Sequence, residues 1–89
     1  MTGENAGVSG AAARRRKIQE IFREVFDDPQ LVIFDQMQAK DVEGWESLNH
    51  ITLIMAIEEA FEIKFTTREV MGFQNVGEMI ACLERKLPS

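Results

Sequence analysis

The hydroxyl group of Ser47 is the side chain in this sequence best placed to carry an attached group. It stands in the run of residues 43–51, where a solvent-facing loop gives way to a strongly apolar stretch that we expect to be helical. A helix start has backbone N–H groups without intrahelical partners and the positive end of the helix dipole, so it favours a phosphate on that hydroxyl. Serine is also a common N-cap residue, and position alone favours this simpler role.

The residues around Ser47 form a more specific pattern than a helix cap. Glu46, Ser47 and Leu48 are followed by an apolar run over residues 51–57 and by an acidic pair at 58–59. This pattern resembles the acyl carrier protein family, in which an Asp-Ser-Leu triplet opens the second helix. The resemblance covers roughly residues 14–87 and extends to helix order and loop placement. Glu46 replaces the family's usual Asp, so this departure bears on transferase recognition more than on the attachment itself.

The resemblance implies a carrier that performs no catalysis itself. Ser47 would carry covalent 4′-phosphopantetheine from coenzyme A, whose thiol holds acyl intermediates as thioesters between enzymes of fatty acid, polyketide or related specialised acyl biosynthesis. The implied partners are a phosphopantetheinyl transferase, an acyl ligase or acyltransferase, and a ketosynthase or other acyl-processing enzymes. Residues 45–50 look more like those of discrete carriers in specialised pathways than those of the housekeeping fatty-acid carrier.

Other functions stay open beside this one. A non-modified helical adaptor would bind basic partners through the acidic face of the second helix, and Ser47→Ala would then cost only about 1 kcal/mol of capping. A peptidyl or aminoacyl carrier would share the attachment, although the paired glycines that usually precede its serine are missing. Catalysis is the weakest alternative: Ser47 and His50 lie near one helical face, but no G-x-S-x-G elbow is present, and we expect His50 to project toward the core.

The composition limits the class of protein. A chain of 89 residues has room for one small domain. Its net charge of -5 and its pI of about 4.8 argue against nucleic-acid binding and favour partners with basic surfaces. We expect the basic run at residues 14–17 to form a solvated face that is able to pair with acids of the second helix.

Cysteine, histidine and hydropathy set further limits. The single cysteine, Cys82, excludes an internal disulfide and is expected in the core, and one histidine gives no ligand set for zinc. The acids Asp41 and Glu43 lack the spacing of a calcium loop, so we expect no metal site. No apolar run approaches the roughly 18 residues of a membrane span, and no signal peptide is evident. We therefore expect a cytoplasmic, soluble protein. We also expect it to be a monomer.

Hydrophobic spacing predicts an all-α fold, a small four-helix bundle with a long loop between helices one and two and a short third helix. Residues 1–11 are expected to be a flexible tail, and residues 12–88 to form the acyl-carrier-like domain. The first helix starts near Ala12 and ends at residues 27–29. Its apolar stripe consists of Ile18, Ile21, Phe22, Val25 and Phe26.

The long connection between residues 29 and 46 is expected to be an ordered loop. Residues 31–34 have the composition of a short strand, but no second strand-like run is available to pair with them. We expect the loop to be pinned to the bundle by four apolar side chains, those of Leu31, Phe34, Met37 and Val42.

The second helix, expected over residues 47–62, divides into two faces. The predicted core face consists of Leu53, Ile54, Ile57 and Phe61. The outer face consists of Leu48, Ile51, Thr52, Met55, Glu58, Glu59 and Glu62. Clustered apolar residues among carboxylates are typical of an interface, so we predict that this face, together with Glu46, binds partners. The alternative is that Ile51 and Met55 pack against the loop or the third helix.

Capping signals predict the last two helices. Thr66 and Glu69 have the spacing of a capping box, and Gly72 is expected to close a short helix over residues 67–71. Asn75 is expected to cap a fourth helix that ends at Pro88. The apolar stripe of that helix consists of Val76, Met79, Ile80, Leu83 and Leu87.

Overall fold

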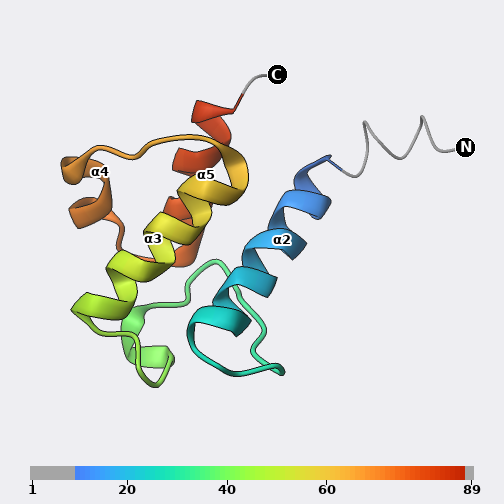
Figure 1. The fold of residues 1–89 in the computed structure, drawn as a ribbon, viewed down its shortest axis with the longest axis vertical. Helices are drawn as coiled ribbons and strands as arrows, with labels where there is room; N and C mark the ends of the chain where they lie inside the picture. Colours follow the sequence, from blue (N-terminus) through green and yellow to red (C-terminus); the bar gives the residue numbers. More distant parts are fainter. Residues whose placement is uncertain (1–9, 88–89) are drawn as a thin grey trace, which may run out of the picture.

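The computed structural model of the protein describes residues 10–87, and within them it is all-helical (Figure 1). The helices are α2 (Gly10–Val25), α3 (Ser47–Phe61), α4 (Thr67–Gly72) and α5 (Val76–Lys86), with a short 3-10 helix, η1 (Ala39–Asp41), in the long loop. No strand occurs in this part of the chain. The predicted all-α architecture, with a long first loop and a short third helix, is confirmed.

Helix α2 begins slightly earlier than the sequence predicts. Gly10 and Ala11 belong to this helix, whereas the sequence predicts that both lie in the flexible tail. The rest of the predicted tail, residues 1–9, lies outside the described residues. The helix ends at Val25, where Asp27 takes a left-handed conformation with φ 53° and the Asp28 N–H donates to the Arg23 carbonyl at 2.9 Å. Residues 27–29 end the helix as predicted.

The connection from α2 to α3 is an ordered loop, as predicted, but one of its anchors differs. Met37 and Val42 are buried and Leu31 is half-buried. Phe34 is 46% exposed, so its prediction as an anchor is wrong, and Ile33 is buried instead. Neighbouring side chains on an extended segment point to opposite sides, so only one of residues 33 and 34 can face the bundle. A hydrogen bond from the Ile33 N–H to Gln19 Oε1, 3.1 Å long, fixes that choice.

The same loop is fastened to the start of α5 by backbone hydrogen bonds. The Val76 N–H donates to the Met37 carbonyl at 2.9 Å, and the Gly77 N–H donates to the Asp35 carbonyl at 2.8 Å. These two donors belong to the first turn of α5, whose N–H groups have no intrahelical acceptors. The loop therefore stabilises α5 while α5 holds the loop in place.

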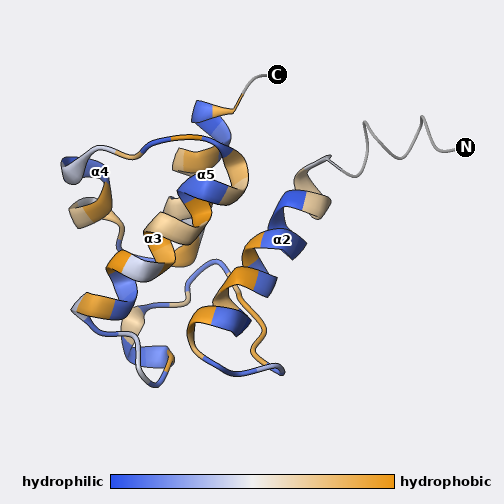
Figure 2. Cartoon of the chain, in the orientation of Figure 1, coloured by the Kyte–Doolittle hydropathy of each residue, from blue (hydrophilic) through white to orange (hydrophobic). Residues whose placement is uncertain are grey.

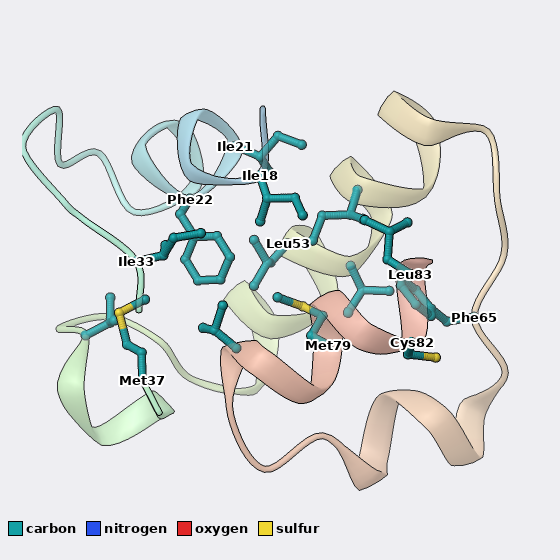
Figure 3. Packing of buried hydrophobic residues seen from close by; sticks show 14 residues of the cluster. Ile18, Ile21, Phe22, Ile33, Met37, Leu53, Phe65, Met79, Cys82 and Leu83 are labelled. Atoms are coloured by element: carbon teal, nitrogen blue, oxygen red, sulfur yellow. The ribbon is translucent and has the colours of Figure 1, made fainter. Parts of the chain in front are cut away.

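The core lies where α2, α3 and α5 meet (Figure 3). Phe22 of α2 points toward Ile33 of the loop and Leu53 of α3, and Cys82 lies near the end of the cluster at Phe65. The burial of Cys82 is confirmed, whereas Phe61, predicted to be core, is only half-buried. Apolar and polar residues alternate in bands along α2, as expected for a helix with one buried stripe (Figure 2).

The basic run at the start of α2 pairs with other elements than predicted. Arg14 donates two hydrogen bonds to Glu84 of α5, from Nε at 2.8 Å and from Nη2 at 2.6 Å, and Arg15 Nη1 donates to Asp35 Oδ1 at 2.9 Å. The suggested pairing of this run with acids of the second helix does not hold for these two arginines. The bidentate Arg14–Glu84 pair instead ties the first described helix to the last one.

The caps of α4 and α5 follow the sequence signals. The Thr66 hydroxyl accepts from the Glu69 N–H at 3.1 Å, and the Thr66 N–H donates to Glu69 Oε1 at 2.8 Å. Asn75 Oδ1 accepts from the Glu78 N–H at 2.8 Å. Gly72 is the last residue of α4 and not the residue beyond it, since Phe73 is the C-cap with extended backbone. Helix α5 ends at Lys86, and the predicted stop at Pro88 lies outside the described residues.

Among residues 10–87, no helix combines the length and the apolar character needed to cross a membrane.

Candidate functional site

Ser47 is the first residue of α3, and its side chain is exposed. The N-cap position is occupied by Glu46, so the interpretation of Ser47 as the N-cap is wrong. The first intrahelical hydrogen bond runs from the His50 N–H to the Glu46 carbonyl at 2.7 Å. The N–H groups of residues 47–49 therefore have no acceptor within the helix. The Glu46 side chain forms no capping hydrogen bond with them. An anion attached to the Ser47 oxygen would meet these free donors and the positive end of the helix dipole.

Trp45 precedes Ser47 in the sequence and His50 follows it, and the rings of these two residues are hydrogen-bonded to each other. Trp45 Nε1 donates to His50 Nδ1 at 3.1 Å, and the two rings are stacked with centroids 6.0 Å apart. Because Nδ1 accepts, His50 Nε2 carries the proton and donates to the Val70 carbonyl of α4 at 3.3 Å. His50 therefore connects the start of α3 to α4 and is half-buried.

This arrangement leaves His50 unsuited to act as a base for Ser47. Both of its ring nitrogens are engaged with other groups, and a general base must reach the proton it removes. Ser47 and His50 share the sequence spacing of a nucleophile and a base on one helix, but the structure does not pair them as such. The contacts of His50 are those of a structural link.

The segment before Ser47 is held rigidly by aromatic packing. Trp45 packs edge-on against Phe22 of α2, with centroids 5.4 Å apart, and it lies tilted against Phe26, with centroids 5.7 Å apart. Asn49 Nδ2 donates to the Gly44 carbonyl at 2.6 Å, across a turn in which Gly44 has φ 88°. A residue with a Cβ would be strained there, so glycine suits this turn. Ser47 thus follows a fixed turn.

The outer face of α3 carries three exposed apolar side chains. Leu48 is 77% exposed, Ile51 50% and Met55 61%, so neither Ile51 nor Met55 packs against the loop or α4 as the alternative required. Glu46, Thr52, Glu59 and Glu62 are also exposed. Glu58 differs from the prediction because it is half-buried and its Oε2 accepts from the Phe65 N–H at 2.8 Å. Its carboxylate anchors the connection to α4, where Glu62 reverses the chain with φ 56°.

A groove of about 280 Å³ lies beside the start of α3. One wall is formed by residues 38–40 at η1, and the other by residues 73–75 between α4 and α5. Trp45, His50 and Met79 complete the lining. The sequence gives no indication of this groove, because its lining comes from four separate segments. The juxtaposition of Trp45 and His50 is not evident from the sequence either, because Phe22 of α2 and Val70 of α4 position the two rings.

Ionisable groups away from Ser47 form a structural link between α4 and α5. The backbone N–H of Thr66 and the Lys86 ammonium, 2.9 Å from Glu69 Oε1, lower the pKa of the Glu69 carboxyl to about 2. Burial raises the pKa of the nearby Cys82 thiol. Across residues 10–87, histidine, cysteine and acidic side chains form no group of three or more that could hold a metal ion.

Comparison with known proteins places this arrangement in a family. Residues 16–83 match the model of the phosphopantetheine attachment site family, a span that includes Ser47 and the whole of α3. The acyl carrier proteins of two strains of Buchnera aphidicola subsp. Acyrthosiphon pisum, Tuc7 and APS, are each 33% identical over 70 residues, which cover 79% of this chain and 88% of theirs. The chain belongs to the acyl carrier protein family.

A solved structure agrees with this assignment. The solution structure of the holo acyl carrier protein from Geobacter metallireducens superposes on the carrier with a TM-score of 0.75 and 35% sequence identity, covering 80% of this chain and 82% of that one. The protein is thus a carrier and not an enzyme, and its cofactor is 4′-phosphopantetheine. The exposed start of α3 fits this group, because its free N–H donors suit a phosphodiester.

Proposed function

We propose that Ser47 Oγ is the attachment atom and that the carrier presents acyl groups, bound as thioesters to the cofactor's terminal thiol, to the enzymes of a fatty acid, polyketide or related specialised acyl pathway. The observation that carries the proposal is the exposed hydroxyl of Ser47 at the first position of α3. On transfer, Ser47 Oγ would form the ester bond to the phosphorus that carries the pantetheine, while the pyrophosphate bond of coenzyme A breaks and adenosine 3′,5′-bisphosphate leaves. The hydroxyl proton of Ser47 would go to a base of the transferase or to water. The free N–H groups of residues 47–49 would then lie next to the phosphodiester.

The rigid turn around Ser47 would supply the carrier's own contribution. Trp45 and His50 hold the residues on both sides of the attachment atom, so the hydroxyl is displayed at one place on the surface. Partner enzymes would find the tethered group at high effective concentration once they are docked beside it. Residues 45–50 are the part of the chain that favours a specialised pathway over general fatty acid synthesis.

Docking itself would use the outer face of α3. Leu48, Ile51 and Met55 offer short-range apolar contact, while Glu46, Glu59 and Glu62 offer negative charge for basic partners. A phosphopantetheinyl transferase, an acyl ligase or acyltransferase, and a ketosynthase or another acyl-processing enzyme are the partners in this proposal. Glu58 contributes less than the sequence predicts, because its carboxylate is bonded to the Phe65 N–H. A cytoplasmic location and a monomeric state belong to the same proposal.

Intact-protein mass spectrometry tests the attachment. The chain is incubated with coenzyme A and a broad-specificity phosphopantetheinyl transferase, beside a Ser47→Ala control. We expect the mass of one phosphopantetheinyl group on the wild type and none on the control. We also expect the free energy of unfolding of the control to stay within about 0.5 kcal/mol of the wild type, since Ser47 is exposed and is not the N-cap.

Two results would contradict the proposal. A mass gain on the Ser47→Ala variant would move the attachment to another residue. No gain on the folded wild type, with several transferases tried, would favour the helical adaptor, whose partner binding would survive Ser47→Ala.

A further inference from the structure

We propose that the thioether of Met55 is a site of reversible oxidation by hydrogen peroxide, and that the resulting sulfoxide weakens the docking of partner enzymes on α3. This inference rests on the proposed function, because it takes the outer face of α3 as the docking surface. It assigns to that surface a chemical sensitivity that the transfer of acyl groups does not use.

The fold separates the methionines of the described residues into two classes. Met37 and Met79 are each 2% exposed, whereas Met55 is 61% exposed and Met71 80%. A peroxide must reach the sulfur atom to oxidise it, so the core should protect the buried pair as long as the protein stays folded. Within residues 10–87, Met55 and Met71 are therefore the two thioethers open to the reagent.

The reaction adds one oxygen atom to the sulfur. The thioether sulfur of Met55 forms a bond to one oxygen of hydrogen peroxide, the O–O bond breaks, and the second oxygen leaves as water with both hydrogen atoms. The sulfur is oxidised and the peroxide is reduced. A methionine sulfoxide reductase reverses the change, because a dithiol removes the oxygen as water and becomes a disulfide.

Met55 differs from Met71 in its position on the proposed docking surface. Ile51 precedes Met55 by four residues on α3, and Leu48 precedes it by seven, so the three side chains form one exposed apolar row. Met71 belongs to α4 and lies outside this row. Oxidation of Met55 therefore places a polar group in the apolar part of the surface, whereas oxidation of Met71 leaves the row intact.

The outer face of α3 has no free side-chain donor for the sulfoxide oxygen. The neighbouring carboxylates of Glu59 and Glu62 accept hydrogen bonds when ionised, and the Thr52 hydroxyl already donates to the Leu48 carbonyl at 3.1 Å. Water would therefore solvate the sulfoxide in the free carrier. Docking of an apolar partner surface would remove this water without a replacement, which is unfavourable.

The test uses the unmodified chain with Met71→Leu, so that Met55 is the one exposed thioether within residues 10–87. Hydrogen peroxide is added, and mass spectrometry of tryptic peptides locates the added oxygen. Transfer from coenzyme A by a broad-specificity phosphopantetheinyl transferase then gives KM and kcat. We expect oxygen on Met55 ahead of Met37 and Met79, a KM for the carrier raised about tenfold, and a kcat within about twofold of the untreated value. Methionine sulfoxide reductases should restore the KM.

Met55→Leu provides the matched control. Leucine has nearly the volume of methionine and carries no sulfur, so the apolar row is kept while the reactive atom is removed. In this variant we expect peroxide to oxidise Met71 and to leave the KM unchanged. Circular dichroism before and after treatment verifies that both variants stay folded.

Three outcomes would overturn the inference. Oxidation of Met37 or Met79 before Met55 would show that exposure does not select the site. An unchanged KM after oxidation of Met55 would show that the docking surface tolerates the sulfoxide. An equal rise of the KM in treated Met55→Leu would place the effect at another residue. In all three cases the untreated wild type still gains the phosphopantetheinyl group, whereas a missing mass gain would reject the attachment at Ser47 itself.

Discussion

At the scale of single residues, Glu46 is the position where this chain departs most informatively from its family. A glutamate at the N-cap of α3 forms no side-chain capping bond, so the N–H groups of the first turn stay free. An aspartate has a shorter side chain that caps well, and it would compete for the same donors. The extra methylene of Glu46 thus favours an unoccupied helix start in the unmodified protein.

This argument predicts that Glu46→Asp stabilises the unmodified carrier. The new carboxylate would accept from N–H groups that have no acceptor now, and we expect a gain of about 0.5–1 kcal/mol in the free energy of unfolding. Urea unfolding of the unmodified protein measures it. Glu43→Asp, an exposed loop change, should leave stability unaltered. Equal stability for wild type and Glu46→Asp would show that these donors are already satisfied.

A second prediction concerns the ring pair around Ser47. His50→Leu removes the acceptor of the Trp45 Nε1–H and the donor to the Val70 carbonyl, so we expect a loss of about 1–3 kcal/mol in unfolding free energy. Trp45→Phe removes the other partner of the first bond. A double-mutant cycle by urea unfolding should give a coupling of about 0.5–1.5 kcal/mol between the two positions. Additive effects would mean that the bond contributes nothing to stability.

At the scale of elements, α4 depends on its neighbours. It has six residues, too few for a helix to be stable alone. The Glu69 carboxylate accepts from the N–H of the N-cap residue Thr66 and also reaches Lys86 of α5. The pKa of Glu69 is about 2, below its ordinary value of 4.5. The stabilisation from this carboxylate is therefore complete above about pH 4.5 and is lost as the pH falls toward 2.

Glu69→Gln should lower stability at neutral pH and flatten the decline of stability between pH 4.5 and 2. The neutral amide keeps the shape of the side chain but does not titrate. Urea unfolding at a series of pH values measures the effect, and Glu20→Gln, an exposed change on α2, serves as the control. An equally steep acid decline in the Glu69→Gln variant would contradict the assignment of this decline to Glu69.

Two glycines near α5 give a matched test of how the loop packs. A Cβ on Gly77 would lie 3.1 Å from the Asp35 carbonyl oxygen and 3.2 Å from the Asp35 Cβ, so Gly77→Ala should destabilise the protein by about 1 kcal/mol or more. Gly72→Ala meets nothing within 4 Å and should stabilise it by about 0.5–1 kcal/mol. Thermal unfolding measures both. Stabilisation by both changes would mean that the loop yields easily at Asp35.

The helices were predictable because their signals are local. The Thr66–Glu69 capping box and the Asn75 cap act over three residues, and the structure has both. The inward choice of Ile33 over Phe34 was not predictable, since it depends on Gln19, fourteen residues away. The Arg14–Glu84 pair spans seventy residues. Long-range contacts of this kind leave no periodic signal in the sequence.

The candidate site shows the same division. The placement of Ser47 at a helix start follows from the local pattern and is confirmed. Position alone favours Ser47 as the N-cap, but Glu46 takes that place and Ser47 follows it by one residue. The Trp45–His50–Val70 link and the groove beside it need the third dimension, because α4 and the α4–α5 connection must fold back to complete them.

At the scale of the whole molecule, the rigid turn and the exposed face of α3 together predict how partners are recognised. Met55 is 61% exposed, so Met55→Ala should change stability by less than about 0.5 kcal/mol. If the Met55 side chain anchors the interface, Met55→Ala should raise the KM of the transferase for the carrier about tenfold, which corresponds to about 1.4 kcal/mol. Steady-state transfer assays at varied carrier concentration measure this change.

The control for that prediction lies elsewhere on the surface. Val32 is 64% exposed in the loop between α2 and α3, and Val32→Ala should leave the KM unchanged. Equal effects of Val32→Ala and Met55→Ala would indicate a general loss of apolar surface. No effect of Met55→Ala would remove the middle of α3 from the interface with this enzyme.

The burial of Cys82 has a consequence for chemical selectivity. A carrier that works through a sulfur atom must keep any other sulfhydryl from competing for acyl groups, oxidants or mixed disulfides. Cys82 is 2% exposed, and burial raises its pKa, so little reactive thiolate forms in the native state. The fold thus makes the tethered thiol the accessible one. A thiol reagent applied to the native carrier with its 4′-phosphopantetheine attached should therefore react with one thiol per cofactor. Cys82 should react in addition only when the protein is unfolded.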